Sequence, residues 1–154
     1  MAAKIDAWLD ENENKIPYSV AHPGGVVFKD NVWVGNEPGQ GLTCATFIVE
    51  LFNELGYPFI DANTWQQRAD DAEWARHILD GMSSRMNAQH VEVQRARIGD
   101  DTIRIRPSDI AAAGHLIREE TETPLTFEQV DPLAMAIEGF LKDPQDGRAS
   151  TERG

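Results

Sequence analysis

Cys44 is the only cysteine in this chain of 154 residues, and it stands where a helix is expected to begin. A glycine-bearing loop ends at Thr43, a residue type that caps helix N-termini, so Cys44 falls in the first helical turn. The partial positive charge at that end of a helix favours a thiolate over a thiol. Because the thiolate is the nucleophilic form, Cys44 is the candidate for covalent catalysis.

A cysteine nucleophile needs a base or counter-ion within reach, and His22 is the first candidate for that role. It begins the first strand of a predicted hairpin, with strands in 18–28 and 32–35 joined by a turn at 29–31. A turn centred near Asp30 gives paired residues whose numbers sum to about 59 or 60. His22 would then lie beside the end of the second strand.

Three polar residues between the hairpin and Cys44 complete the predicted site. Asn36 and Glu37 fall next to His22 in this register, so either one is a candidate to orient the imidazole. The side-chain amide of Gln40 and the backbone N–H of Cys44 are candidates for an oxyanion hole. Two other histidines, His90 and then His115, are alternative bases for the same cysteine.

The residues around this pair resemble a known group of enzymes. The run Cys44-Ala45-Thr46-Phe47 is similar to the C-x-x-F start of the catalytic helix in NlpC/P60-type papain-like cysteine hydrolases. His22-Pro23-Gly24 is similar to the H-x-G start of a strand in the same group, and its position before the cysteine matches the circularly permuted branch. The resemblance covers residues 18–56 and implies a papain-like fold and a thiol hydrolase, peptidase or amidase.

The same residues have a structural interpretation. A single cysteine at a helix start, followed by an apolar face, is often a small buried hydrophobe, and His22 before a proline can be an ordinary loop residue. Taken as a catalytic pair, Cys44 and His22 predict a cysteine hydrolase or acyltransferase acting on an amide, peptide or thioester. The alternative is a non-enzymatic binding or accessory protein that acts through its surface.

The charge composition limits the classes of partner that the protein is expected to bind. The chain has 14 basic and 26 acidic residues and a net charge of −12, which repels nucleic acid and anionic lipid. We expect a small-molecule or peptide substrate, no nucleic acid or membrane partner, and no cofactor. No Cys/His cluster has the spacing of a metal site, and the N-terminal sequence does not match a signal peptide, so the expected location is the cytoplasm.

Hydrophobic periodicity predicts one helix-rich α+β domain over residues 1–142 with a small antiparallel sheet, followed by a disordered tail at 143–154. The strongest helix signal is at 44–55, where Gly56 provides the stop. The other predicted helices are 3–13, 64–81 (capped by Thr64 with Gln67), 87–98, 107–113 and a final one capped by Thr126 with Gln129 that restarts at Pro132. Short strands are predicted at 57–62 and 102–106.

Two charged groups are expected to be structural. The acidic set Asp70, Asp71 and Glu73 is predicted to be a solvated helix face. The basic set Arg95, Arg97, Arg104 and Arg106 is predicted to pair with the protein's own acids.

Overall fold

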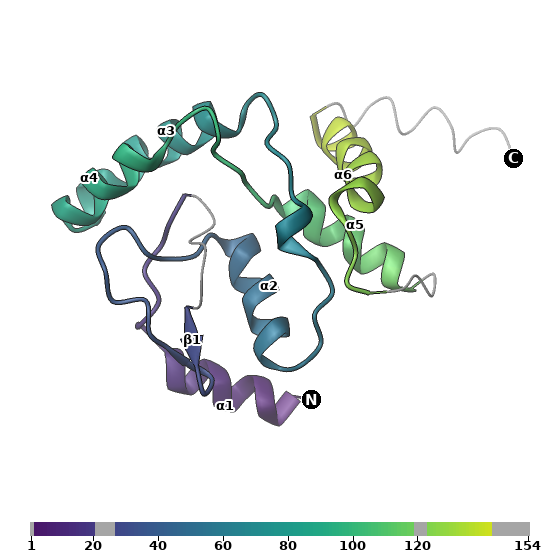
Figure 1. Cartoon of the computed structure of the whole chain (residues 1–154), viewed down its shortest axis with the longest axis horizontal. Coiled ribbons are helices and arrows are strands. Elements are labelled where there is room, and N and C mark those ends of the chain that lie inside the picture. The colour runs from purple at the N-terminus through teal and green to yellow at the C-terminus, as the bar shows by residue number, and fades with distance from the viewer. Residues whose placement is uncertain (1, 21–26, 119–122, 143–154) are drawn as a thin grey trace, which may run out of the picture.

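The computed structural model describes residues 2–20, 27–118 and 123–142. It confirms a helix-rich α+β architecture with a small antiparallel sheet (Figure 1). The predicted tail at 143–154 and the residues around His22 lie outside the described part of the chain. In chain order the elements are α1 (Ala2–Asn12), β1 (Phe28–Lys29), β2 (Val32–Trp33), α2 (Cys44–Glu54), the 3-10 turn η1 (Ala62–Thr64), α3 (Asp71–Met82), the 3-10 turn η2 (Ser83–Arg85), α4 (Ala88–Arg97), α5 (Pro107–Arg118) and α6 (Phe127–Lys142).

The predicted hairpin forms only around its turn: its strands are Phe28–Lys29 and Val32–Trp33 instead of 18–28 and 32–35, and Tyr18 makes a parallel bridge with Leu42. Its register also differs by one or two residues from the expected one. Asp30 and Asn31 both have positive φ, 53° and 66°, as a two-residue type I′ turn requires. Phe28 pairs with Trp33 and Lys29 with Val32, so paired numbers sum to 61 instead of 59 or 60. The turn is centred between Asp30 and Asn31, which accounts for the difference.

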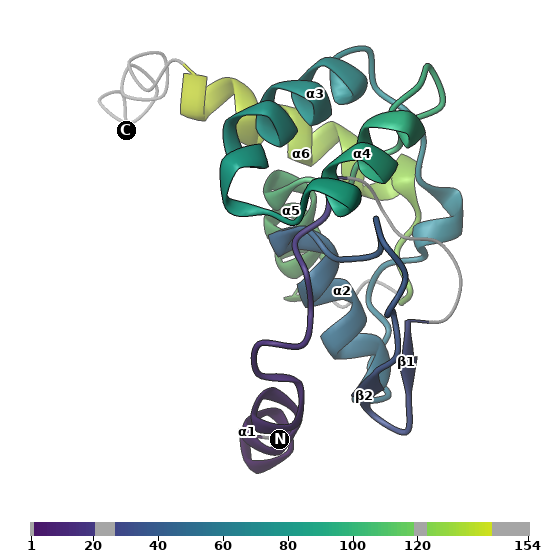
Figure 2. The same cartoon turned by 90° about the vertical axis from the view of Figure 1, so that its left-hand side faces the viewer.

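Asn12, the last residue of α1, joins that helix to the hairpin. Its side-chain amide nitrogen donates to the backbone oxygens of Trp8 at 2.9 Å and Asn31 at 2.8 Å. Its side-chain oxygen accepts the Trp33 backbone N–H at 2.7 Å. A single buried amide therefore holds α1 against the turn and the second strand, in the lower part of Figure 2.

Helix α2 begins and ends as its sequence predicts. The Thr43 hydroxyl accepts the Thr46 backbone N–H at 3.1 Å, while the Thr46 hydroxyl accepts the Thr43 backbone N–H at 2.8 Å. At the other end, Gly56 has a φ of 81° and donates to the Asn53 oxygen. Tyr57 donates to the Phe52 oxygen, which completes a Schellman stop.

Two hydrophobic cores meet at α2, as its wide apolar surface predicts. On one side, Ala45 and Val49 pack with residues of α5, α6 and the segment around Phe59. On the other side, Leu51 packs with Trp8 of α1 and with the hairpin. Figure 1 shows α2 between α1 and the hairpin on one side and α5 on the other.

A third core holds α3 and α4 together at the opposite end of the molecule from α1 (Figure 2). Its buried members are Val20, Ala75, Leu79 and Val91. The predicted helix at 87–98 is confirmed as α4, and the Asn87 side chain caps it by accepting the backbone N–H groups of Gln89 and His90.

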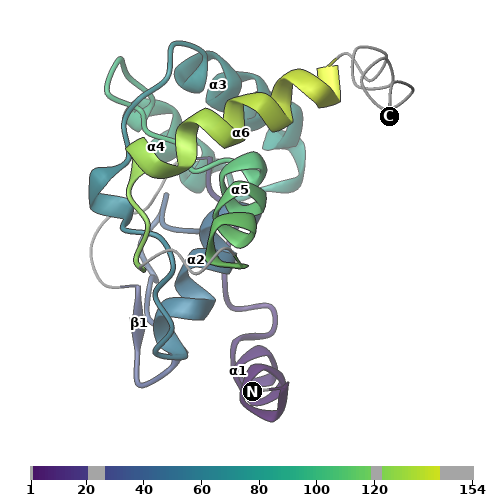
Figure 3. The ribbon, with the colours of Figure 1, turned by 90° about the vertical axis from the view of Figure 1, so that its right-hand side faces the viewer.

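A buried ionic network fixes the N-terminus of α5 against the segment before α3. Asp109 is fully buried and accepts hydrogen bonds from the Trp65 indole, the Arg68 guanidinium and the Arg106 backbone N–H. The Arg106 guanidinium bonds the carboxylates of Asp70, Asp71 and Glu138. Figure 3 shows the layer that results, with α6 lying across α5 and α3 beside them.

This network confirms that Arg106 pairs with the protein's own acids and corrects the prediction for the acidic set. Asp71 is completely buried, and its carboxylate accepts hydrogen bonds from the Arg68 backbone N–H and the Arg106 guanidinium. Asp70 and Glu73 are exposed, as predicted for a solvated face. Arg95 pairs with Asp80 on the surface.

Several predicted elements differ from those observed. Thr64 does not begin a helix: it ends η1, and α3 starts only at Asp71. The segment 102–106 is irregular, since among the described residues no neighbouring segment pairs with it as a strand. The predicted strand at 57–62 is reduced to a bridge between Ile60 and Leu125.

The last two helices differ from their predictions, α5 in length and α6 in continuity. Helix α5 continues from Pro107 to Arg118, well past the expected end at residue 113. Helix α6 is continuous from Phe127 and contains Pro132 within it, so no new helix starts there. The Gln129 side chain accepts the Thr126 backbone N–H at 2.8 Å, which is half of the predicted capping box.

Candidate functional site

Cys44 occupies the first position of α2, and its side chain is exposed. The reciprocal hydrogen bonds between Thr43 and Thr46 fix the backbone of this turn, so the direction of the thiol is set by the helix. A cysteine that served only as a small buried hydrophobe would be covered by its neighbours, and Cys44 is not. Its thiol is accessible at the positive end of a helix dipole.

A hollow of about 430 Å³ lies against Cys44. Its walls come from α1, from the segment between α1 and residue 18, and from the start of α2. Most of the lining is apolar, and its polar residues include Asn12, Glu13 and Asn14. The apolar wall consists of Trp8, Leu9, Ile16, Pro17, Leu42 and Phe47. The hollow can therefore hold an apolar group beside an accessible thiol.

Tyr18 also lines the hollow and is a residue that the sequence alone did not single out. Burial raises the pKa of its phenol, and the negative charge that Cys44 can carry raises it further. The positive charge of Arg104 acts in the opposite direction and is outweighed. Tyr18 therefore keeps its proton at neutral pH, and its hydroxyl is a hydrogen-bond donor. Its side chain also packs against the core of α3 and α4.

Arg104 stands near this site without a carboxylate bonded to it among the described residues. Its guanidinium carbon lies 3.6 Å from the centre of the Trp74 ring, a cation–π arrangement. Burial and the neighbouring Arg106 lower the pKa of Arg104. The positive charge of Arg104 interacts with the Tyr18 phenol, although the chain as a whole has a net charge of −12.

The structure gives His90 a different role from the one considered in the sequence. It is buried on α4, where Nδ1 accepts the Gly39 backbone N–H at 3.0 Å and Nε2 lies 2.9 Å from the Tyr18 backbone oxygen. The Gln94 side-chain nitrogen also lies 2.6 Å from Nε2. Both ring nitrogens are thus used to hold backbone segments, which leaves neither free to act as a base for Cys44.

The other histidines do not line the hollow in the part of the chain that is described. His115 is exposed on α5, and His77 is exposed on α3. The first candidate, His22, lies outside the described residues. The pairing of Cys44 with His22 therefore stays a prediction.

Asn36, Glu37 and Gln40 lie in a loop that is held against α4 instead of the hollow. The hairpin ladder ends where the Val34 N–H donates to Val27, and Asn36 then turns back by donating to Val34. The Gln40 side-chain oxygen accepts the Glu37 backbone N–H at 3.0 Å. None of these three residues lines the hollow. The orienting roles of Asn36 and Glu37 stay predictions because their partner His22 lies outside the described residues, and the side chain of Gln40 is bonded within its own loop.

Gly39 sets the path of this loop. It has a φ of 83°, and a Cβ added there would lie 2.5 Å from Cγ1 of Val93 on α4. The loop backbone therefore lies directly on α4, where the Arg97 guanidinium also approaches the Gly39 oxygen at 3.4 Å. This close packing fixes the loop on the side of α4.

No family model, curated protein or solved structure matches the chain. The likeness to NlpC/P60-type enzymes therefore rests on the two short motifs alone. Among the described residues, no group of three His, Cys, Asp or Glu side chains is arranged to hold a metal ion. No described helix has the length and apolar character needed to cross a membrane.

Proposed function

We propose that this protein transfers or hydrolyses acyl groups through Cys44, with the apolar part of the substrate held in the hollow between α1 and α2. The observation that carries the proposal is the position of the thiol: it is exposed, it belongs to the first turn of a capped helix, and it lies in the wall of an apolar hollow. A neutral phenol, Tyr18, lines the same hollow.

A thioester is the substrate that needs the fewest groups from the protein. The Cys44 sulfur attacks the carbonyl carbon, a new S–C bond forms, and the C–S bond of the donor breaks. The donor's sulfur leaves as a thiolate and takes a proton from solvent, while water or a second acceptor later releases the acyl group from Cys44. The Tyr18 hydroxyl donates to the carbonyl oxygen as negative charge develops there.

An amide or peptide makes an additional demand, because its leaving nitrogen must be protonated before it departs. In the proposal His22 supplies that proton after serving as the counter-ion of the Cys44 thiolate. Thioester exchange and amide hydrolysis therefore differ in their need for His22.

The test uses octanoyl N-acetylcysteamine thioester and follows octanoylation by intact-protein mass spectrometry. The matched control is a Cys44→Ala protein that carries Ser84→Cys, which moves the single cysteine to an exposed site away from the hollow. We expect Cys44 to be acylated about 100-fold faster than the relocated cysteine of the control, the factor typical of one well-placed oxyanion donor. Tyr18→Phe should remove most of that advantage.

His22→Gln should slow the hydrolysis of octanoyl p-nitroanilide far more than it slows thioester exchange. Equal acylation rates for Cys44 and the relocated cysteine would overturn the proposal, since the hollow would then contribute nothing. An unchanged rate in Tyr18→Phe would remove Tyr18 from the mechanism.

A further inference from the structure

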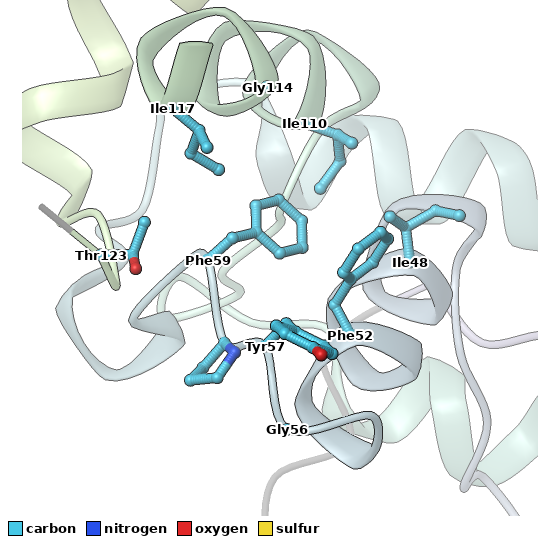
Figure 4. A pocket seen from close by; sticks show the side chains of 10 residues that line it. Ile48, Phe52, Gly56, Tyr57, Phe59, Ile110, Gly114, Ile117 and Thr123 are labelled. Atoms are coloured by element: carbon cyan, nitrogen blue, oxygen red, sulfur yellow. The ribbon is translucent and has the colours of Figure 1, made fainter. Parts of the chain in front are cut away.

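A second hollow lies on the other side of α2, and nothing in the thiol chemistry uses it. It has a volume of about 510 Å³ and is formed by α2, by the segment that follows it and by α5 (Figure 4). Figure 4 shows the side chains of its apolar wall around a common space: Ile48, Phe52, Phe59, Ile110 and Ile117. We refer to it as the α2–α5 pocket.

The walls of the α2–α5 pocket are fixed by packing. The rings of Phe52 and Phe59 meet edge to face with their centres 5.3 Å apart. Phe59 is buried in the core that also contains Ala45 and Val49. The Schellman stop at Gly56 determines where the chain turns from α2 into this wall. The pocket is thus built by elements that the fold holds in place.

Gly114 keeps the α5 side of the pocket open. It lies in the middle of α5 and lines the pocket, and a Cβ placed on it would meet no atom within 4 Å. Glycine destabilises a helix interior by roughly 0.5–1 kcal/mol relative to alanine. The backbone of Gly114 is helical, so other residues can replace it without backbone strain. A larger side chain there would fill part of the pocket.

The lining defines the chemistry of a ligand. Among the described residues that line the pocket, none is Lys, Arg, Asp, Glu or His, and the polar side chains are the hydroxyls of Tyr57 and Thr123. An ionised group placed there would lose its hydration without gaining a partner. The net charge of −12 additionally disfavours anions. A pocket of this size with an apolar wall and few hydroxyls suits an uncharged small molecule.

We propose that the α2–α5 pocket binds an uncharged, mainly apolar small molecule that carries at most a hydroxyl or carbonyl group. This site is separate from the Cys44 hollow and does not depend on the proposed acyl chemistry. It assigns a ligand class to a part of the protein in which the sequence showed only a helix face.

The experiment compares two ligands of equal chain length, 1-decanol and decanoate, at pH 8. Binding is followed through the methyl resonances of ¹³C-labelled isoleucines in the full chain. We expect 1-decanol to shift Ile48, Ile110 and Ile117, which line the pocket, and to leave Ile78 and Ile98 of the α3–α4 core unchanged. Decanoate should bind at least about tenfold more weakly, because its charge cannot be paired in the pocket.

A pair of variants separates the pocket from the rest of the surface. Gly114→Leu puts a side chain into the pocket, whereas Gly139→Leu makes the same change on α6, where a Cβ also meets nothing within 4 Å. Both changes favour a helix, so both proteins should be at least as stable as the parent. We expect Gly114→Leu to weaken 1-decanol binding by about tenfold or more and Gly139→Leu to leave it unchanged.

Three outcomes would overturn the inference: methyl shifts spread over all isoleucines, equal binding of decanoate and decanol, or equal affinities of the two glycine variants. Cys44→Ala should bind 1-decanol as the parent does. The experiment therefore distinguishes a lack of acyl transfer at Cys44 from a lack of ligand binding in the α2–α5 pocket.

Discussion

Replacing Asp109 with asparagine tests the buried ionic network most directly. The Asp109 carboxylate is completely buried, and one of its oxygens lies 2.7 Å from Nη2 of Arg68. The other oxygen accepts from the Trp65 indole at 3.1 Å and from the Arg106 backbone N–H at 2.7 Å. Asparagine keeps the shape of the side chain, but its NH₂ group must face either Arg68 or the pair of donors from Trp65 and Arg106. It also removes the negative charge that pairs with Arg68.

The expected cost follows from this geometry. Removing one partner of a buried ion pair typically destabilises a protein by about 3–5 kcal/mol, because the remaining charge stays buried. Arg68 retains Asp131 as a partner, so the lower part of this range applies. For a chain of this length, each kcal/mol lowers the melting temperature by about 2–4 °C. We therefore expect Asp109→Asn to lower it by about 6–12 °C.

Urea unfolding followed by circular dichroism measures the free energy, and calorimetry measures the melting temperature. The matched control is Asp80→Asn, which breaks the exposed pair of Asp80 with Arg95 and should cost no more than about 1 kcal/mol. If Asp109→Asn is no more destabilising than Asp80→Asn, the network does not stabilise α5 in the way proposed.

Three further predictions follow from particular contacts. Asn12→Ala should cost about 1–3 kcal/mol in urea unfolding, because it leaves the buried Trp33 N–H without its acceptor; a loss near zero would mean that another group replaces it. Gly56→Ala should cost about 1–2 kcal/mol because of its positive φ, whereas a neutral result would show that the α2 stop can rearrange. Burial raises the pKa of the Glu138 carboxyl, but Ser108 and Arg106 outweigh it and hold the pKa below its usual value. The ionised Glu138 carboxylate therefore stabilises the fold above about pH 4.5, and this stabilisation is lost as the pH falls. Below pH 4.5 the parent should lose more stability than Glu138→Gln, and parallel pH profiles of unfolding free energy would contradict this.

The elements that the sequence predicts well are those whose ends are determined locally. Asp30 and Asn31 tolerate positive φ, so the two-residue turn is visible in the residue types themselves. Gly56 stops α2 through a left-handed conformation, and Asn87 starts α4 through its own side chain. Each of these signals uses atoms within a few residues of one another, which a sequence displays directly.

The predictions of local structure are wrong where residues distant in the sequence supply the hydrogen-bond partners. Thr64 looks like a helix cap, but its hydroxyl donates to the Asp61 oxygen and accepts the backbone N–H of Phe127, 63 residues later. The alternating segment 102–106 leads into Arg106, whose guanidinium bonds carboxylates of α3 and α6. A local pattern cannot reveal partners that only the tertiary fold supplies.

For the candidate site, the sequence could identify Cys44 and its helix position but not its neighbours. Uniqueness, the preceding Thr43 and the following apolar face are all local features. Tyr18 reaches the hollow because its segment bridges to Leu42, with Leu42 donating to Pro17 and Ser19 donating to Leu42. That contact joins residues more than twenty positions apart, so no spacing rule could have found the phenol.

Helix α2 is the common wall of both candidate sites, and its packing explains why they can act independently. Phe47 faces the Cys44 hollow and Ile48 faces the α2–α5 pocket, as expected for consecutive residues that are about 100° apart around a helix. Between them, Ala45, Val49 and Leu51 are buried in two different cores, so α2 is held from both sides. Close-packed interiors resist small displacements, and a ligand on one face of such a helix has little room to move the other face. Our two proposals thus assign the thiol chemistry and the apolar pocket to two faces of one rigid helix, each open to its own substitutions.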